Sequence, residues 1–121
     1  MNALLVFLGG GLGAAARHGV NVAGLRAFGP GFPWGTFAVN VVGSLAMGLL
    51  VGAALKFELG TSARLFLATG FLGGFTTFSA FALDVANLSA GRLPEALGYI
   101  VGSVALSILA VFAGLSLVRA L

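Results

Sequence analysis

Residues 70–81, GFLGGFTTFSAF, place flexible backbone, hydroxyl groups and aromatic rings together inside a long apolar stretch. The pair Gly73-Gly74 followed by Thr76-Thr77 disfavours a continuous helix, because glycine and β-branched residues both weaken helices. A helix break within a membrane leaves carbonyl and N–H groups without helical partners, which is tolerated only where they are buried in protein or bind something. Freed carbonyls suit a hard cation, and freed N–H groups at the start of the second half-helix suit an anion.

Three phenylalanines of this stretch, Phe75, Phe78 and Phe81, follow one another at i, i+3 and i+6, so Phe78 and Phe81 share a helix face. Ordinary packing explains most phenylalanines, and it is the alternative here. The edge of an aromatic ring is electropositive, however. Ring edges turned toward a narrow passage favour a small anion without a fixed positive charge, and conduction needs such weak, exchangeable sites.

Other polar side chains lie deep in apolar segments. Asn40 lies about two turns into the second segment. Tyr99, Ser103 and Ser107 recur at i, i+4 and i+8, which puts them on one helix face. Two isolated serines would normally bond back to carbonyls of their own helix. Together with Tyr99 and Asn40, they indicate a polar track through a membrane.

The elements that position these groups belong to a membrane protein. The chain is 60% hydrophobic and only 7% charged, whereas soluble domains carry about 25% charged residues. It has no cysteine and a single histidine, which excludes disulfides, thiolate metal sites and a multi-histidine site within one chain. The six basic residues are scattered near segment ends, as is typical of membrane anchoring, and we expect no nucleic-acid partner.

A membrane-spanning helix needs about 20 mostly apolar residues. The chain contains four such segments, residues 3–24, 34–55, 62–88 and 95–118. Glycine and proline interrupt the sequence in the first and third connections, as expected at helix ends. We therefore predict a single all-α transmembrane domain over residues 1–121, with four transmembrane helices of which the third is broken.

The basic residues give no signal for orientation in the membrane. Three lie on the side that holds both termini and the middle connection, and three lie on the other side, so the bias is zero. The first three are Lys56, Arg64 and Arg119, and the other three are Arg17, Arg26 and Arg92. Either so few charges balance by chance and other signals decide the orientation, or the chain has dual topology. In the second case copies insert both ways and pair as an antiparallel dimer with a two-fold axis in the membrane plane.

Small residues recur at the spacing that lets helices approach closely. The pairs are Gly9 with Gly13, Gly48 with Gly52, Gly70 with Gly74, and Gly98 with Gly102. With 20 glycines in the chain some matches arise by chance, so the pairs predict close packing and no particular interface.

Three longer motifs are spread over the first three segments. They are Gly9-Gly10-x-x-Gly13-Ala14-x-x-Arg17, Gly35-Thr36-Phe37-x-Val39-Asn40-x-x-Gly43, and Gly70-x-x-Gly73-Gly74-Phe75-Thr76-Thr77-Phe78-Ser79-x-Phe81. The third is specific, whereas the first alone would be weak. Through them the chain resembles, from end to end, the Fluc (CrcB) fluoride channels of bacteria. One departure is Ala80, where that family often has Thr or Ser.

The resemblance implies an antiparallel, dual-topology homodimer with two fluoride pores in the bacterial inner (plasma) membrane. It implies passive export of cytoplasmic fluoride by electrodiffusion, which protects the cell from fluoride toxicity. A structural sodium ion (Na+) would lie at the centre of the dimer, held by the backbone carbonyls of Gly73 and Thr76. Arg17 would lie near the aqueous vestibule. The fluoride pore would be formed by Asn40, Thr77, Phe78, Ser79, Phe81, Tyr99, Ser103 and Ser107.

Other classes of protein compete with this interpretation. A small four-span drug transporter depends on an acidic residue in its first span, and residues 3–24 contain none. A structural subunit of a larger complex would explain the glycines but not the hydroxyl track or the broken helix. An enzyme is the least favoured class, because the only acids, Glu58, Asp84 and Glu95, form no carboxylate pair and no nucleophile–base arrangement.

Overall fold

The protein is entirely helical, and the computed structural model describes every residue from Met1 to Leu121. The elements in chain order are α1 (Asn2–Phe28), α2 (Trp34–Phe57), α3 (Thr61–Arg64), the π-helix η1 (Leu65–Leu72), α4 (Gly73–Phe75), α5 (Phe78–Ser89) and α6 (Leu93–Arg119). Four segments are long and apolar enough to cross a membrane, namely Asn2–Phe28, Trp34–Phe57, Thr61–Ser89 and Leu93–Arg119. The prediction of an all-helical protein with four such helices is confirmed.

Glycine and proline set the helix ends at one end of the bundle. The helix α1 continues through Gly24, where the predicted segment ended, to Phe28, because no proline and no residue with a positive φ occurs before Gly29. Gly29 has a φ of 75°, which side chains disfavour, and Pro33 cannot continue a helix. Gly91, with a φ of 95°, turns the chain between α5 and α6. Pro94 lies in the first turn of α6, where a backbone N–H would have no helical partner.

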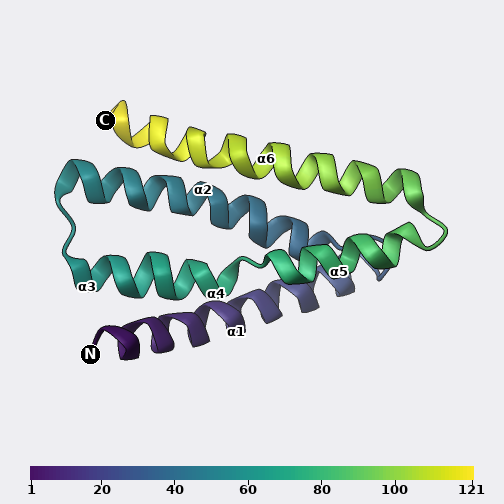
Figure 1. Ribbon diagram of the computed structural model, residues 1–121, viewed down its shortest axis with the longest axis horizontal. Coiled ribbons are helices and arrows are strands. Elements are labelled where there is room, and N and C mark those ends of the chain that lie inside the picture. The colour runs from purple at the N-terminus through teal and green to yellow at the C-terminus, as the bar shows by residue number, and fades with distance from the viewer.

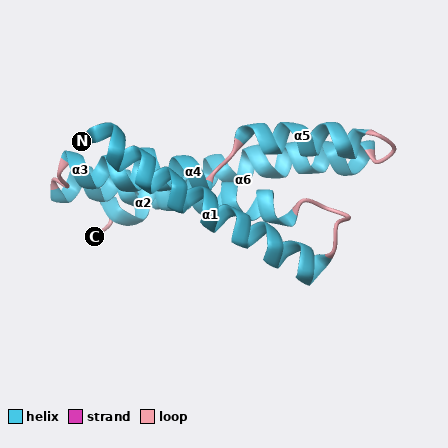
Figure 2. Cartoon of the chain, turned by 90° about the horizontal axis from the view of Figure 1, so that it is seen from below, coloured by secondary structure: helices cyan, strands magenta, loops and turns pink.

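The helices pack mainly as two groups, α1 against η1 and α4, and α2 against α6. Figure 1 shows the four spans running roughly parallel, with both termini and the α2–α3 connection at one end, which we call the terminal end. Toward the opposite end, α5 and α6 diverge from the end of α1 and the start of α2 (Figure 2). We call this the splayed end. It holds the connections α1–α2 and α5–α6.

Glycines allow the closest approaches between helices. A Cβ atom on Gly13 would collide with the carbonyl of Phe71, and one on Gly48 would collide with the carbonyl of Val111. Three of the four predicted glycine pairs lie at such contacts, whereas Gly98 of the fourth meets nothing within 4 Å. Close backbone contact therefore joins α1 to the third span and α2 to α6.

Candidate functional site

The third span is interrupted at Thr76 and Thr77, which lie between α4 and α5 in extended backbone conformations. Their φ and ψ angles are -88° and 157° at Thr76, and -154° and 124° at Thr77. Just before, η1 and its i→i+5 bonds widen the helix and move its side chains out of the α-helical register. Spacing in the sequence alone therefore misplaces the faces of residues Leu65–Leu72.

Side chains replace the helical partners that the interruption removes. Asn40 of α2 donates from Nδ2 to the Thr77 carbonyl at 3.0 Å, and the Thr77 N–H donates to Asn40 Oδ1 at 2.8 Å. The Thr77 hydroxyl accepts from the Ala80 N–H at 3.1 Å and so caps α5. The Thr76 hydroxyl donates to the Leu72 carbonyl at 2.8 Å. The extended segment is thus held by specific bonds on both sides.

These bonds divert two backbone donors from their usual acceptors. In a continuous helix, the Thr77 N–H would bond the Gly73 carbonyl and the Ala80 N–H would bond the Thr76 carbonyl. Here they bond the side chains of Asn40 and Thr77 instead. The carbonyls of Gly73 and Thr76 therefore lack their i+4 donors. No group of three or more His, Cys, Asp or Glu side chains could hold a metal ion, so backbone oxygens are the cation ligands this region offers.

A groove with a volume of about 320 Å³ lies between α2, the interruption and α6, and we call it the polar groove. It brings together most of the residues that sequence analysis assigned to a pore. These are Asn40, Thr77, Phe78, Phe81, Ser103 and Ser107. No Lys, Arg or His lines the groove. An anion there would meet hydrogen-bond donors and aromatic side chains, without a fixed cation to trap it.

The rings of Phe78 and Phe81 form one wall of the polar groove, and Tyr99 packs behind Phe81. The ring centroid of Phe81 lies 5.5 Å from that of Phe78, at an interplanar angle of 45°, and 5.1 Å from that of Tyr99, at 48°. Phe81 and Tyr99 are 8% and 1% exposed and belong to the small core between α5 and α6. Phe78 is 77% exposed. Phe81 therefore has a fixed position, whereas Phe78 stands at the open side of the groove.

Ser103 lacks the bond to its own helix that was the alternative explanation for it. Its side chain is 5% exposed, and its Oγ atom is buried without any hydrogen-bond partner. By contrast, Ser89 at the end of α5 donates to the Val85 carbonyl at 2.8 Å. A buried, unpaired hydroxyl costs about 1–3 kcal/mol. Ser103 therefore has free hydrogen-bonding capacity at the polar groove, and Ser107, one turn further along α6, lines the same groove.

Two of the predicted pore residues lie outside the polar groove. The Tyr99 hydroxyl donates to Asp84 Oδ2 on α5 at 3.0 Å. Ser79 is exposed, and its hydroxyl lies 3.3 Å from that of Thr77. The structure thus separates Tyr99 from the two serines that share its helix face in the sequence pattern.

Arg17 lies at the depth of the interruption. Its Nε atom donates to the Gly74 carbonyl of α4 at 3.1 Å. It lines neither the polar groove nor the larger cavity at the splayed end. A guanidinium in this position ties α1 to the last helical turn before Thr76.

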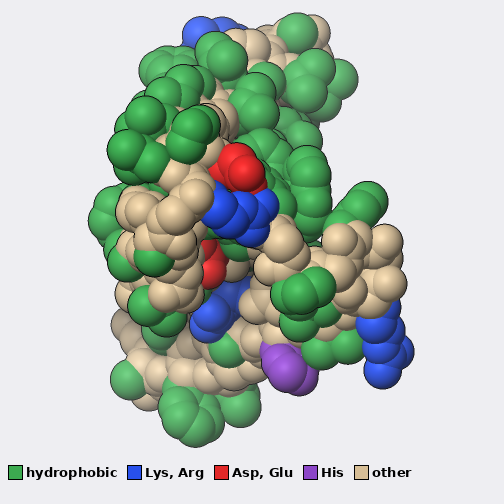
Figure 3. All heavy atoms as spheres, turned by 90° about the vertical axis from the view of Figure 1, so that its right-hand side faces the viewer, with side chains coloured by type: hydrophobic (Ala, Val, Ile, Leu, Met, Phe, Trp, Pro, Cys, Tyr) green, Lys and Arg blue, Asp and Glu red, His purple; other side chains and the backbone are tan.

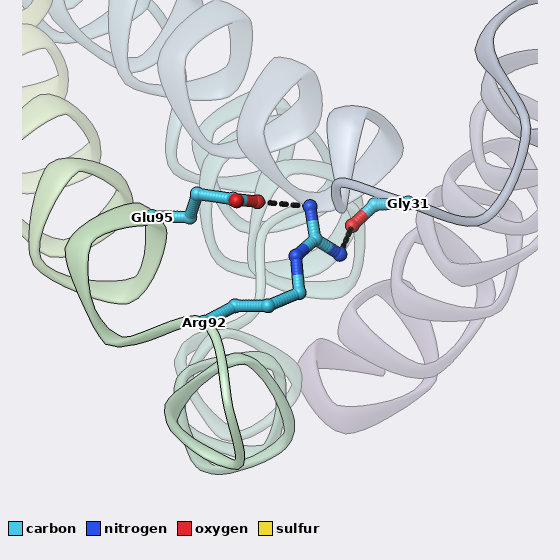
Figure 4. A network of polar contacts seen from close by, with 3 residues as sticks. All are labelled: Gly31, Arg92 and Glu95. Atoms are coloured by element: carbon cyan, nitrogen blue, oxygen red, sulfur yellow. Dashed lines mark hydrogen bonds and ion pairs between the residues drawn. The ribbon is translucent and has the colours of Figure 1, made fainter.

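The larger cavity, of about 460 Å³, opens between the α1–α2 connection and α5. Asp84, Asn87 and Arg92 are among its lining residues. Figure 3 looks onto the splayed end and shows acidic and basic side chains gathered in its middle, with hydrophobic side chains around them. Arg92 donates to the Gly31 carbonyl and pairs with Glu95, so it links the two connections at this end (Figure 4).

Sequence reasoning missed a second polar row. Thr36, Asn40 and Ser44 follow one another at i, i+4 and i+8 on α2, which is the spacing that singled out the row on α6. Thr36 is 7% exposed, and Asn40 and Ser44 line the polar groove. The spacing of four residues between these polar side chains is the feature of the sequence that could have predicted the row. The pairing of Asp84 with Tyr99 has no comparable signal, because it joins two different helices.

Known proteins resemble this chain over nearly its whole length. The model of a family described as CrcB-like protein, Camphor Resistance (CrcB), matches residues 4–115. The fluoride-specific ion channel FluC 2 of Nitrobacter hamburgensis is 54% identical over 121 residues, which cover 98% of each chain. The fluoride-specific ion channel FluC of Chelativorans sp. is 58% identical over 120 residues, covering 98% of this chain and 96% of the relative.

The protein of the same name from Rhodopseudomonas palustris is 55% identical over 124 residues, covering 100% of this chain and 99% of the relative. The matches span all four apolar segments, of which the second, third and fourth line the polar groove. On these grounds the chain belongs to the CrcB family and is a multi-pass membrane protein.

Proposed function

We propose that this protein is a fluoride-selective ion channel that exports cytoplasmic fluoride from a bacterial cell by passive electrodiffusion across the inner membrane. The single observation that carries the proposal is the polar groove, in which six predicted pore residues meet beside an interrupted span. The relatives named as fluoride-specific channels support the choice of ion. Export of fluoride would protect the cell from fluoride toxicity.

The groove offers fluoride a replacement for its water shell. Asn40 Nδ2 carries two hydrogens, of which one bonds the Thr77 carbonyl, so the other is available to an anion. The unpaired Ser103 hydroxyl is a second donor, and Ser107 is a third. Phe81 adds an electropositive ring edge at a fixed position. Several weak donors in sequence allow an ion to enter and leave, which conduction requires.

The working form in this proposal is an antiparallel, dual-topology homodimer with one pore in each half. Phe78 is 77% exposed in the single chain, and it borders a groove with hydroxyl and amide groups. Such groups are unfavourable against lipid, and a second copy would cover them. With Arg17 at the depth of the interruption, three basic residues remain near the terminal end and two near the splayed end. A bias of one charge gives little preference for either orientation.

A sodium ion at the dimer centre is the cation we propose for the diverted carbonyls. The carbonyls of Gly73 and Thr76 have lost their i+4 donors to Asn40 and Thr77. Oxygen ligands suit a hard cation. Two copies related by a two-fold axis would supply both carbonyls twice, and a single bound ion would then fix the interrupted helices against each other. The chemistry the ion supplies is a positive charge that holds these oxygens together.

Ion efflux from liposomes tests the channel proposal. Vesicles that contain purified protein are loaded with potassium fluoride or potassium chloride, and valinomycin is added to balance the charge. We expect rapid fluoride release with negligible chloride release, followed with ion-selective electrodes. A folded protein that releases no fluoride would contradict the proposal and favour a structural subunit. Fluoride release only in the presence of a proton gradient would contradict passive electrodiffusion.

A further inference from the structure

A third cavity, of about 250 Å³, lies at the terminal end between α2 and the start of the third span. It exists because α2 packs mainly on α6 while η1 packs mainly on α1, so the two elements separate. We call this cavity the terminal groove. Its apolar walls are Leu50, Val51, Ala54 and Leu55 of α2, and Leu65 and Ala68 of η1.

One end of the terminal groove is polar and positively charged. Thr61 and Arg64, from the first turn of the third span, line it there. Arg64 is exposed and takes part in no hydrogen bond or ion pair of its side chain, whereas nearby Lys56 donates to the Val118 carbonyl at 3.2 Å. The guanidinium of Arg64 is therefore a free, planar donor at the mouth of an apolar groove.

The terminal end as a whole attracts anions. Lys56, Arg64 and Arg119 lie there, and Glu58 is the acidic residue among them. Basic residues next to a membrane surface contribute about 1 kcal/mol each to binding of anionic lipid. An anionic group at the membrane surface would thus meet both the local charge and the unpaired guanidinium of Arg64.

The geometry points to an anionic phospholipid, and we propose that the terminal groove holds the upper part of one of its acyl chains with the phosphate on Arg64. Residues Leu50 to Leu55 cover about 8 Å of helix, which is roughly half of the ~15 Å depth of one leaflet. The apolar walls suit the chain at this depth, and the Thr61 hydroxyl and the Arg64 guanidinium suit phosphate oxygens at the surface.

Native mass spectrometry of the full-length protein in detergent tests this site. The protein is titrated with phosphatidylglycerol or phosphatidylcholine of the same acyl chains, and the number of retained lipids per chain is counted. We expect wild-type protein to retain phosphatidylglycerol preferentially. Arg64→Gln should lower that preference about tenfold, because the choline cation cancels the phosphate charge in phosphatidylcholine, so the guanidinium favours the lipid with a net negative charge. Inorganic phosphate should not compete at equal concentration, because it lacks the acyl chain.

Matched variants separate this site from general electrostatics. Arg119→Gln removes the same charge from the same end without lining the groove, so it loses only the general electrostatic contribution and should lower the preference less than Arg64→Gln does. Ala68→Leu and Ala54→Leu fill the groove from opposite walls and should lower retention of both lipids. Equal loss of preference in Arg64→Gln and Arg119→Gln would overturn the proposal. So would groove-filling variants that weaken a dimer while lipid retention stays unchanged, since a second copy would then occupy the groove. Neither result depends on ion conduction, so the outcome of this test is independent of the proposed channel function.

Discussion

Asn40 and Thr77 lie 37 positions apart in the chain and exchange two hydrogen bonds, of 3.0 Å and 2.8 Å, between a side-chain amide and a backbone N–H and carbonyl. The amide of Asn40 thereby acts as the backbone partner that an interrupted helix would lack. Backbone groups away from water need such partners. The same side chain lines the polar groove, so one residue both holds the interruption and faces the proposed ion.

Replacement of Asn40 is expected to affect both roles. Asn40→Ala leaves the N–H and carbonyl of Thr77 unpaired, which should lower the free energy of unfolding by about 1–3 kcal/mol. Fluoride efflux should fall as well. Thermal melting in detergent and liposome efflux measure the two effects. Asn2→Ala, at an exposed position at the start of α1, is the control and should change neither. An unchanged melting temperature for Asn40→Ala would show that the reciprocal pair contributes little.

Phe81→Ile tests whether the ring edge matters to permeation. Phe81 is 8% exposed and packs against Phe78 and Tyr99, so an aliphatic residue of similar bulk keeps the packing but removes the electropositive edge. We expect fluoride flux to be abolished or sharply cut, while size-exclusion chromatography still shows a folded dimer. The control is Phe112→Ile on the exposed face of α6, where flux should persist. Wild-type flux from Phe81→Ile would refute the ring-edge explanation.

Gly43→Ala tests the close packing of α2 against the interruption. A Cβ atom there would collide with the Thr76 side chain and crowd the ring of Phe75. We expect a loss of about 1–3 kcal/mol in unfolding free energy, as is usual for overpacking. Gly19→Ala in α1 meets nothing within 4 Å, and it should raise stability by about 0.5–1 kcal/mol because alanine favours helix. Thermal melting of both variants should show a lower melting temperature for Gly43→Ala and a higher one for Gly19→Ala. Equal shifts in the two melting temperatures would argue against close contact between Gly43 and Thr76.

Ser103→Ala should change stability and flux in opposite directions. The Ser103 Oγ atom is buried and has no hydrogen-bond partner, so its removal should raise unfolding free energy by about 1 kcal/mol. The same change deletes a donor from the polar groove and should lower fluoride efflux. Melting and efflux of one preparation provide both values. A variant that is less stable than wild type would indicate that Ser103 already has a partner within the protein.

Sodium dependence of stability tests the proposed cation. We assume that the carbonyls of Gly73 and Thr76 bind sodium only in the folded dimer. Sodium at a hundred times its Kd should then raise the free energy of unfolding by about 2.7 kcal/mol. The melting temperature in sodium chloride should therefore be higher than in the chloride of N-methyl-D-glucamine, because that cation is too large to be bound by a cage of carbonyls. Lithium and potassium salts at equal ionic strength serve as controls for screening. Identical melting temperatures in all salts would contradict the proposed sodium site.

Composition and hydropathy were enough to predict the class of protein and the number of its spans. A chain in which only 7% of the residues are charged cannot form a water-facing surface. Four apolar segments of sufficient length therefore predict four membrane-spanning helices. The hydroxyls, amides and rings that meet in the polar groove were also predicted individually, because polar groups at membrane depth are costly and their positions stand out. These predictions depend on whether the protein lies in lipid or in water and on the type of residue at each position. Both can be read from the sequence without knowing which helices are in contact.

Contacts between helices could not be obtained in this way. The pairing of Asn40 with Thr77, of Tyr99 with Asp84 and of Arg17 with Gly74 each joins residues on different elements. The π-helix Leu65–Leu72 also shifts side chains relative to the 3.6-residue period on which face assignments rest. Only the tertiary structure decides which hydroxyl keeps a partner and which, like Ser103, stays free, because a hydrogen bond depends on where a second helix places its donors and acceptors.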